Sequence, residues 1–97
     1  FEYLRVNSPS AEVRGHGPGQ AQLQSGKRDV GIENIRLMGN YAIQISFDDG
    51  HDSGIFSWDY LQHLFNNRDI IWKRYLEDLD KASASRDPNV QVLKLEP

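Results

Sequence analysis

The side chains best suited to chemistry near neutral pH are the three histidines, because imidazole titrates there without a perturbing environment. His51 has the most suggestive neighbours, since Asp48, Asp49 and Asp52 surround it in the sequence. Carboxylates and imidazole on one turn suit a divalent cation. Aspartate is also a preferred turn residue for reasons unrelated to metals. We favour the turn-forming interpretation and keep a metal site as the alternative.

A second histidine, His16, lies in a glycine-rich segment, GHGPG, at residues 15–19. Three glycines and a proline interrupt any regular ladder, so this segment predicts a loop. Its backbone N–H groups could meet an anion, but no Gly-Lys-Ser or Gly-Lys-Thr follows, so it is not a phosphate loop. His16 therefore joins His51, Asp49 and Asp52 only as a further ligand of the alternative metal site.

Nucleophilic and thiolate chemistry finds no support in the sequence. There is no cysteine, which excludes a disulfide, a thiolate metal site and a cysteine nucleophile. Serines are plentiful, but none lies in a Gly-x-Ser-x-Gly elbow, and no catalytic triad can be assigned. We therefore predict that the chain is not an enzyme and has neither catalytic residues nor a cofactor.

A β-hairpin must position His51 and its acidic neighbours. Apolar and polar residues alternate over 41–47, the pattern of a strand with one face on a core. Asp49-Gly50 then supplies a strong hairpin signal, and Gly50 is expected to have a positive φ. The second strand is expected to end at Ser57, which is a good N-cap for the following helix.

Two registers fit this hairpin. A two-residue loop places Asp48 opposite His51, whereas a three-residue loop places Phe47 opposite His51. The three-residue loop also places Ile43 opposite Ile55, which gathers the isoleucines on one face. We favour it, because the buried face sets strand register.

Helical periodicity follows the hairpin and covers the predicted sheet. One helix begins after Ser57, and a second is expected over 68–82 after Asn67.

Upstream, a strand over 30–38 with a bulge near Asn34 completes a three-stranded meander. Ser8 is the expected N-cap of a short helix that has Pro9 in its first turn. The fold class is therefore α+β, a small antiparallel sheet covered by two main helices. The predicted core comprises Ile43, Ile45, Phe47, Trp58, Leu61, Trp72, Tyr75 and Leu76.

The length and composition indicate one small polar domain, because the chain has 97 residues, of which 38% are hydrophobic and 26% are charged. The net charge is −3 and the basic residues are scattered, which argues against a nucleic-acid partner. No apolar run reaches the length of a membrane span, and we expect a cytoplasmic protein.

We place the domain at residues 1–88 and a tail at 89–97. The similarity of FEYL at 1–4 to WDYL at 58–61 suggests that a hairpin originally preceded Phe1.

Several segments carry a resemblance to a known family. They are YLRVNSPSAEV at 3–13, DGHDS at 49–53 and the later Trp58. Together they resemble the gamma-butyrobetaine-hydroxylase-like N-terminal domain, over most of the chain as far as about Pro88. The HGPG loop, the GNYA turn at 39–42 and the SRDP segment at 85–88 are most similar to the stand-alone bacterial version, which has no assigned activity.

The resemblance implies a remnant of a metal site. In the hydroxylases, this domain precedes an iron- and 2-oxoglutarate-dependent catalytic domain and carries a structural zinc, held by a Cys-x-Cys-x-x-Cys run and a histidine. Carried over to this chain, the cysteine positions fall on Ser8, Ser10 and Val13, and the histidine falls on His51. Valine cannot ligate zinc, and neutral hydroxyls are poor ligands beside thiolates. We therefore expect no bound metal.

The resemblance also indicates a class of function. Similar domains occur fused to Mrp-type ATPases that handle iron–sulfur clusters, and the oxygenase catalytic domain lies outside the resemblance. The implied function is a non-catalytic binding or adaptor domain with a protein partner, accessory to iron–sulfur or iron-dependent oxygenase systems. The alternative is a metal-binding domain that uses His51, Asp49 and Asp52, with His16.

Overall fold

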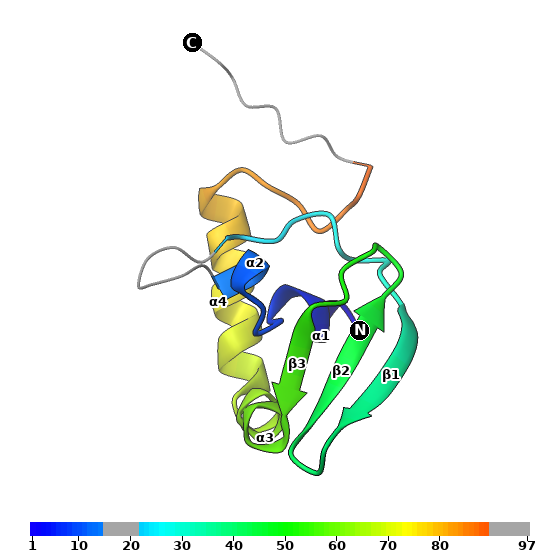
Figure 1. The fold of residues 1–97 in the computed structure, drawn as a ribbon. Helices are drawn as coiled ribbons and strands as arrows, with labels where there is room; N and C mark the ends of the chain where they lie inside the picture. Colours follow the sequence, from blue (N-terminus) through cyan, green and yellow to red (C-terminus); the bar gives the residue numbers. More distant parts are fainter. Residues whose placement is uncertain (15–21, 90–97) are drawn as a thin grey trace.

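The computed structural model describes residues 1–14 and 22–89 of the chain. Its helices and strands follow in the order α1 (Glu2–Val6), α2 (Ala11–Arg14), β1 (Ile32–Met38), β2 (Ala42–Phe47), β3 (Gly54–Ser57), α3 (Trp58–Asn66) and α4 (Arg68–Lys81). The strands form one antiparallel sheet in the order β1-β2-β3, with helices packed against it (Figure 1). This confirms the predicted α+β class. In the described segments, no helix is long and apolar enough to cross a membrane.

The turn of the hairpin has the predicted local structure. The backbone N–H of Phe47 donates to the carbonyl of His51 at 2.9 Å, and the N–H of Gly50 donates to the carbonyl of Phe47 at 3.2 Å. Gly50 has a φ of +89°, which confirms the expected left-handed conformation. The bulge in β1 is also confirmed, because the pairing with β2 shifts between Ile32 and Asn34.

The register of β3 differs by one residue from the favoured prediction. Ile43 lies opposite Phe56 rather than Ile55. Phe56 is therefore fully buried, whereas Ile55 is 41% exposed. The same shift places Gly54 on the inner face, where a Cβ atom would collide with the hydroxyl oxygen of Ser8. Glycine at this position gives Ser8 the space that it occupies, a long-range requirement that the alternation of β2 does not reveal.

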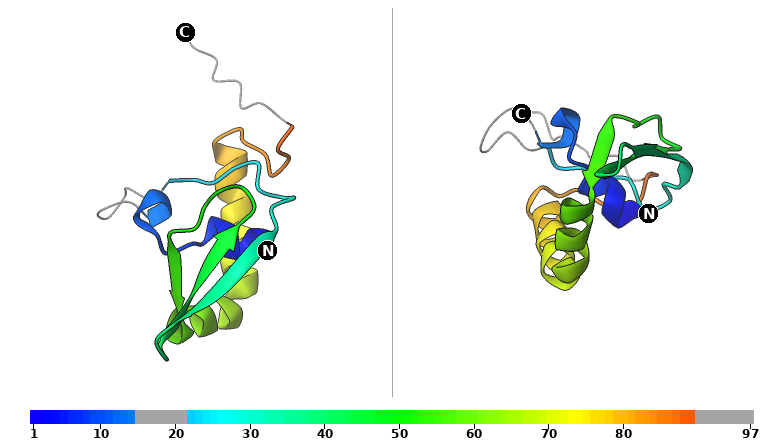
Figure 2. Two further views of the ribbon diagram at one scale, coloured as in Figure 1. Left: turned by 45° about the vertical axis from the view of Figure 1, so that its right-hand side comes forward. Right: turned by 60° about the horizontal axis from the view of Figure 1, so that its bottom comes forward.

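Helix α1 is the centre of the molecule and lies between the sheet and α4 (Figure 2). Tyr3 shows how it is held: its hydroxyl donates to the carbonyl of Leu64 at 2.5 Å, and its ring packs edge-on against Trp72 with centroids 6.2 Å apart. Two buried clusters flank the helix. The first comprises Ile45, Phe47, Phe56 and Leu64, and the second comprises Val6, Tyr75 and Leu79.

The predicted core is right except for two residues. Ile45, Phe47 and Tyr75 are buried, and the partly buried side chains of Ile43, Leu61 and Trp72 pack against the two clusters. Trp58 and Leu76 are 45% and 40% exposed, so their assignment to the core was wrong.

The two exposed residues have different physical reasons. Trp58 lies where β3 ends and α3 begins, and its indole N–H donates to the carbonyl of Asn40 at 2.8 Å. Leu76 follows Tyr75 on α4, whose buried stripe consists of Tyr75 and Leu79. Helical periodicity identifies apolar positions, but which side of α4 meets α1 depends on tertiary packing.

Of the two N-cap residues predicted from the sequence, the structure confirms one. The side chain of Ser57 accepts a hydrogen bond from the N–H of Tyr60 at 3.1 Å, which confirms the N-cap of α3. The expected N-cap at Ser8 is wrong. Helix α2 begins at Ala11, and the carbonyl of Ser10 accepts from the N–H of Arg14 at 2.9 Å. Ser8 is instead directed into the interior, where its hydroxyl bonds to His51.

The segment after α4 returns to α1. The guanidinium of Arg86 forms a two-pronged ion pair with Glu2, with its Nε at 2.9 Å from Oε2 and its Nη2 at 2.7 Å from Oε1. It also lies over the ring of Trp72, 5.1 Å from the centroid. The carboxylate of Glu2 is only 8% exposed, so this pair is geometrically suited to hold the two segments together. The glycine segment at 15–19 and the tail from residue 90 lie outside the described residues.

Candidate functional site

Ser8, Ser10 and His51 form a buried polar cluster. The hydroxyl oxygen of Ser8 lies 2.9 Å from Nε2 of His51, and that of Ser10 lies 3.3 Å from the same nitrogen. The two hydroxyl oxygens are 3.4 Å apart. Ser8 is completely buried, and His51 is 5% exposed. The structure thus brings together three of the four positions that the resemblance assigns to zinc ligands, although more than forty residues separate the serines from the histidine.

Two segments position this cluster. Ser8 and Ser10 lie on the connection between α1 and α2, where the N–H of Ser10 donates to the hydroxyl of Ser8 at 3.5 Å. His51 follows the β2–β3 turn, and its ring lies 6.1 Å from the ring of Phe47. The fourth position, Val13, is buried within one turn of Ser10, with its N–H donating to the carbonyl of Ser10 at 3.1 Å.

The Ser8 hydroxyl and the His51 imidazole are the groups of a nucleophile–base pair, but both are buried in the structure. A serine hydroxyl bonded to an imidazole can attack a substrate only if the substrate reaches it. Ser8 has no exposed surface, and two hydroxyls share Nε2 of His51. Among the described residues, every buried side-chain nitrogen and oxygen has a hydrogen-bond partner. The hydrogen bonds of the cluster therefore join the α1–α2 connection to the segment that follows the β2–β3 turn.

Asp49, a ligand of the alternative metal site, is engaged by basic groups. Its Oδ2 accepts from Nε of Arg5 at 2.9 Å and from Nζ of Lys27 at 2.8 Å, and its Oδ1 accepts from the N–H of His51 at 3.2 Å. Asp52 is exposed. In residues 1–14 and 22–89, no three His, Asp or Glu side chains are placed to share a metal ion, and His16 lies outside these ranges. The turn brings Asp49 to His51 without assembling a ligand set.

The environment of Asp49 determines its ionisation. Burial alone would raise the pKa of its carboxyl group. The hydrogen bonds from Lys27, Arg5 and the backbone of His51 outweigh burial and lower this pKa from 3.8 to about 2. Because the folded-state pKa is depressed, the ion pair stabilises the folded state above about pH 4 and loses this effect as the pH falls toward 2.

We expect Asp49→Asn to lower the free energy of unfolding at pH 7 by about 1 kcal/mol, the upper end for ion pairs that keep some contact with solvent. The difference from the unmodified protein should narrow as the pH falls from about 4 to about 2, because protonation removes the same charge from Asp49. Urea unfolding at a series of pH values measures this. The matched control is Asp52→Asn on the same turn, which removes an exposed carboxylate and should change the free energy of unfolding at pH 7 by about 0.5 kcal/mol or less. If the two proteins still differed by the full amount in free energy of unfolding at pH 2, this would contradict the role of the ion pair.

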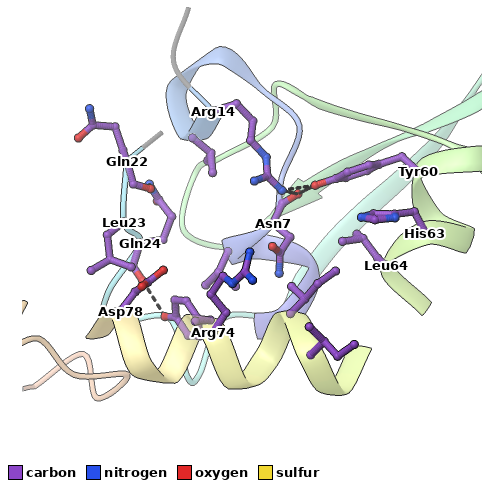
Figure 3. A pocket seen from close by; sticks show the side chains of 15 residues that line it. Asn7, Arg14, Gln22, Leu23, Gln24, Tyr60, His63, Leu64, Arg74 and Asp78 are labelled. Carbon is purple, nitrogen blue, oxygen red and sulfur yellow. Dashed lines mark hydrogen bonds between the residues drawn. The ribbon is translucent and has the colours of Figure 1, made fainter. Parts of the chain in front are cut away.

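A cavity of about 370 Å³, which Val13 also lines, lies among α2, the segment 22–24, α3 and α4 (Figure 3). Its lining includes Arg14, Tyr60, His63 and Arg74. The sequence analysis missed these residues as a set, because they come from three separate helices and match no local motif.

Three solved structures are similar to this chain in sequence and in fold. One NMR solution structure is 52% identical, and the match covers 99% of this chain and 76% of that chain with a TM-score of 0.78. A second NMR solution structure is 45% identical, with coverage of 99% and 70% and a TM-score of 0.74. A crystal structure of a protein of unknown function from Acidithiobacillus ferrooxidans, of the DUF971 family, is 41% identical over 66% of this chain and 61% of that chain, with a TM-score of 0.53. No curated protein matches.

The sequence also matches a family model. The model describes the gamma-butyrobetaine hydroxylase-like N-terminal domain, and it matches residues 1–62. This range includes Ser8, Ser10, Val13 and His51, together with the whole sheet. The similarity to a DUF971 protein is consistent with the stand-alone version of the domain. The chain belongs to the gamma-butyrobetaine hydroxylase-like N-terminal family.

Proposed function

We propose that this chain is a non-catalytic binding domain that engages a cytoplasmic protein partner through strand β1. The observation that carries the proposal is the exposure of two apolar side chains on the inner face of the sheet. Ile35 and Leu37 of β1 are 52% and 70% exposed. Exposed apolar residues that lie together on one element are typical of interaction sites.

The sheet register explains why these side chains form a surface. Ile35 lies opposite Ile45 and Leu37 lies opposite Ile43, so all four share the face that meets the helices. Ile45 is buried by that packing, whereas the β1 residues extend beyond it. The apolar face of the core thus continues onto β1 without a covering element from the described part of the chain.

The edge of the sheet adds a second reason. Strand β1 is an outer strand, and within the described residues only β2 pairs with it. An open edge presents unpaired backbone groups to which an extended segment of another protein can add. Side chains of the added strand would meet Ile35 and Leu37. Iron–sulfur or iron-dependent oxygenase systems supply the partner in this proposal, as the association with Mrp-type ATPases suggests.

The alternative, a metal-binding domain, requires a cation to displace Arg5 and Lys27 from Asp49. Three hydrogen bonds to the Asp49 carboxylate favour the ion pair over the metal. Elemental analysis of the purified protein separates the two proposals. We expect no stoichiometric metal, and one bound ion per chain would support the metal-binding function.

The partner-binding surface is tested with Leu37→Asp. A charge at this exposed position should abolish capture of a partner from the native cytoplasm without lowering the melting temperature, because little buried area is lost. The matched control is Leu76→Asp, which places the same charge at an exposed leucine of α4. Quantitative mass spectrometry should show one protein that is retained by the unmodified and Leu76→Asp proteins and lost by Leu37→Asp. Equal retention by Leu37→Asp would contradict the proposal.

A further inference from the structure

The cavity between α2, the segment 22–24, α3 and α4 has the size and construction of a ligand site. Its volume of about 370 Å³ falls within the range of small-molecule pockets, which is about 300–1,000 Å³. It lies apart from β1 and was not assigned by the proposed function. Figure 3 shows Arg14 and Arg74 among the side chains that line it.

The apolar wall of this cavity is already formed. Val13, Leu64 and Tyr75 line it, and these residues are 2%, 2% and 8% exposed. They come from α2, α3 and α4, so the wall depends on the packed core rather than on a single loop. The hydroxyl of Tyr75 donates to the carbonyl of Gln24 at 2.6 Å, which fixes the adjoining segment 22–24 of the lining. These buried residues support the lining from beneath, and the apolar side chains that a ligand can reach are Leu23 and Ile70, which are 41% and 65% exposed.

Arg14 supplies one fixed positive charge. Its Nη2 donates to the carbonyl of Asn7 at 3.1 Å and also to the hydroxyl of Tyr60. The guanidinium lies 5.7 Å from the centroid of the Tyr60 ring. These contacts hold the side chain of Arg14 over the cavity (Figure 3). They involve no acid, so its charge is not neutralised by them.

Arg74 supplies a second positive charge from the opposite side. It rises from α4 toward the same hollow as Arg14 (Figure 3). Among the described residues, the structure records no hydrogen bond or ion pair for its guanidinium. Asp78 lies one turn further along α4 on the cavity lining, so two arginines and one aspartate leave one net positive charge. Two guanidinium groups that converge on an apolar hollow favour an anion, and the net charge matches a monoanion.

We propose that this cavity binds a small organic carboxylate. The carboxylate accepts hydrogen bonds from Arg74, Arg14 adds a second positive charge, and the apolar body lies against Leu23 and Ile70. Carboxylate suits this site better than phosphate because Asp78 would repel a dianion. Arg gives directional donors for a planar carboxylate.

The test uses 3-phenylpropionate as the probe, with 3-phenylpropanamide as its uncharged analogue and inorganic phosphate as an anion without an apolar body. Each is added to the isotope-labelled protein, and amide signals are followed by NMR. We expect 3-phenylpropionate to shift the signals of Arg14, Leu64 and Arg74 in a saturable manner at concentrations up to about 10 mM. The other two probes should bind at least about fivefold more weakly, since each lacks one of the two recognised features.

Arg74→Gln tests the residue that carries the proposal. It should weaken 3-phenylpropionate binding by about fivefold or more, because a charge-assisted hydrogen bond is lost. The matched control is Arg68→Gln, the same change on the same helix at a residue outside this cavity lining. Both arginines are exposed, so both variants should keep the melting temperature and the NMR spectrum of the folded protein.

Several results would overturn the carboxylate assignment. They are the absence of saturable shifts, equal binding of 3-phenylpropanamide, tighter binding of phosphate at the same signals, and unchanged affinity in Arg74→Gln. Shifts confined to β1 would also overturn it. Leu37→Asp separates this proposal from the proposed function, because it alters β1 and leaves the cavity lining intact.

Discussion

The triple variant Ser8→Cys, Ser10→Cys and Val13→Cys is expected to bind one zinc ion, with His51 as the fourth ligand. Cysteine thiolates and a histidine nitrogen are the ligands of structural zinc sites. The change restores the ligand types that the resemblance assigns to these positions. The unmodified protein is expected to bind no stoichiometric zinc, because its hydroxyls compete poorly with thiolates.

The existing distances favour this result. The hydroxyl oxygens of Ser8 and Ser10 lie 2.9 Å and 3.3 Å from Nε2 of His51, and they are 3.4 Å apart. Ligand atoms around a tetrahedral zinc lie about 3 to 4 Å from one another, given bonds of about 2.0–2.3 Å. The backbone already brings two of the three new side chains to this separation. Val13 is buried within one turn of Ser10, so its replacement by cysteine adds the third thiolate from the same segment.

Zinc should raise the stability of the triple variant. Free zinc at 100 to 1,000 times the dissociation constant adds about 3 to 4 kcal/mol to the free energy of unfolding. For a domain of this size, that corresponds to a rise in melting temperature of about 10 °C or more. Calorimetry with zinc and with a chelator measures the effect, and the charge-transfer absorption of bound cobalt reports thiolate ligation.

Two controls define the ligands. The double variant Ser8→Cys and Ser10→Cys keeps Val13, and the triple variant combined with His51→Gln removes the imidazole. Both should bind zinc more weakly than the triple variant, because each lacks one ligand. A triple variant that remains folded and binds no zinc would contradict the expectation. Stoichiometric zinc in the unmodified protein would contradict the view that hydrogen bonds replace metal here.

Phe56→Ala is expected to lower the free energy of unfolding by about 3–5 kcal/mol, since it empties a large buried position. Phe56 is completely buried and belongs to the cluster that joins the sheet to α3. The matched control is Ile55→Ala, the adjacent residue of β3 with the opposite orientation. Ile55 is 41% exposed, so its truncation should cost about 1 kcal/mol or less.

Urea unfolding of the two variants also tests the hairpin register. The pairing of Ile43 with Phe56 places Phe56 inside, whereas the register favoured from the sequence places Ile55 inside. A larger loss for Ile55→Ala than for Phe56→Ala would support the sequence-based register. Comparable losses would contradict the burial difference between the two side chains.

Local features of the chain could be predicted because local physics determines them. Asp49-Gly50 requires a turn, and Gly50 has the positive φ that such a turn favours. Ser57 caps α3 with its own hydroxyl. The register of β3 could not be predicted, because it depends on Gly54 leaving space for Ser8, a residue in a distant segment.

The candidate sites show the same division. Ser8 and His51 meet across 43 residues, and no periodicity in the sequence connects them. Their association could be anticipated only through the resemblance to a family. The cavity that contains Arg14 and Arg74 had no such signal, because neither arginine lies in a recognisable motif. Its existence follows from how the helices pack, which depends on the complete tertiary structure.

The central position of α1 affects how the domain can form during synthesis. This helix leaves the ribosome before the segments that bury it, since Tyr3 bonds to Leu64 and Glu2 bonds to Arg86. A helix of five residues has little stability alone, because nucleation is costly and few hydrogen bonds follow. The nascent chain must therefore keep the apolar face of α1 available until α4 and Arg86 have been translated. Because these contacts join residue 3 to residue 64 and residue 2 to residue 86, we expect the domain to complete its folding only after residue 86 has been translated.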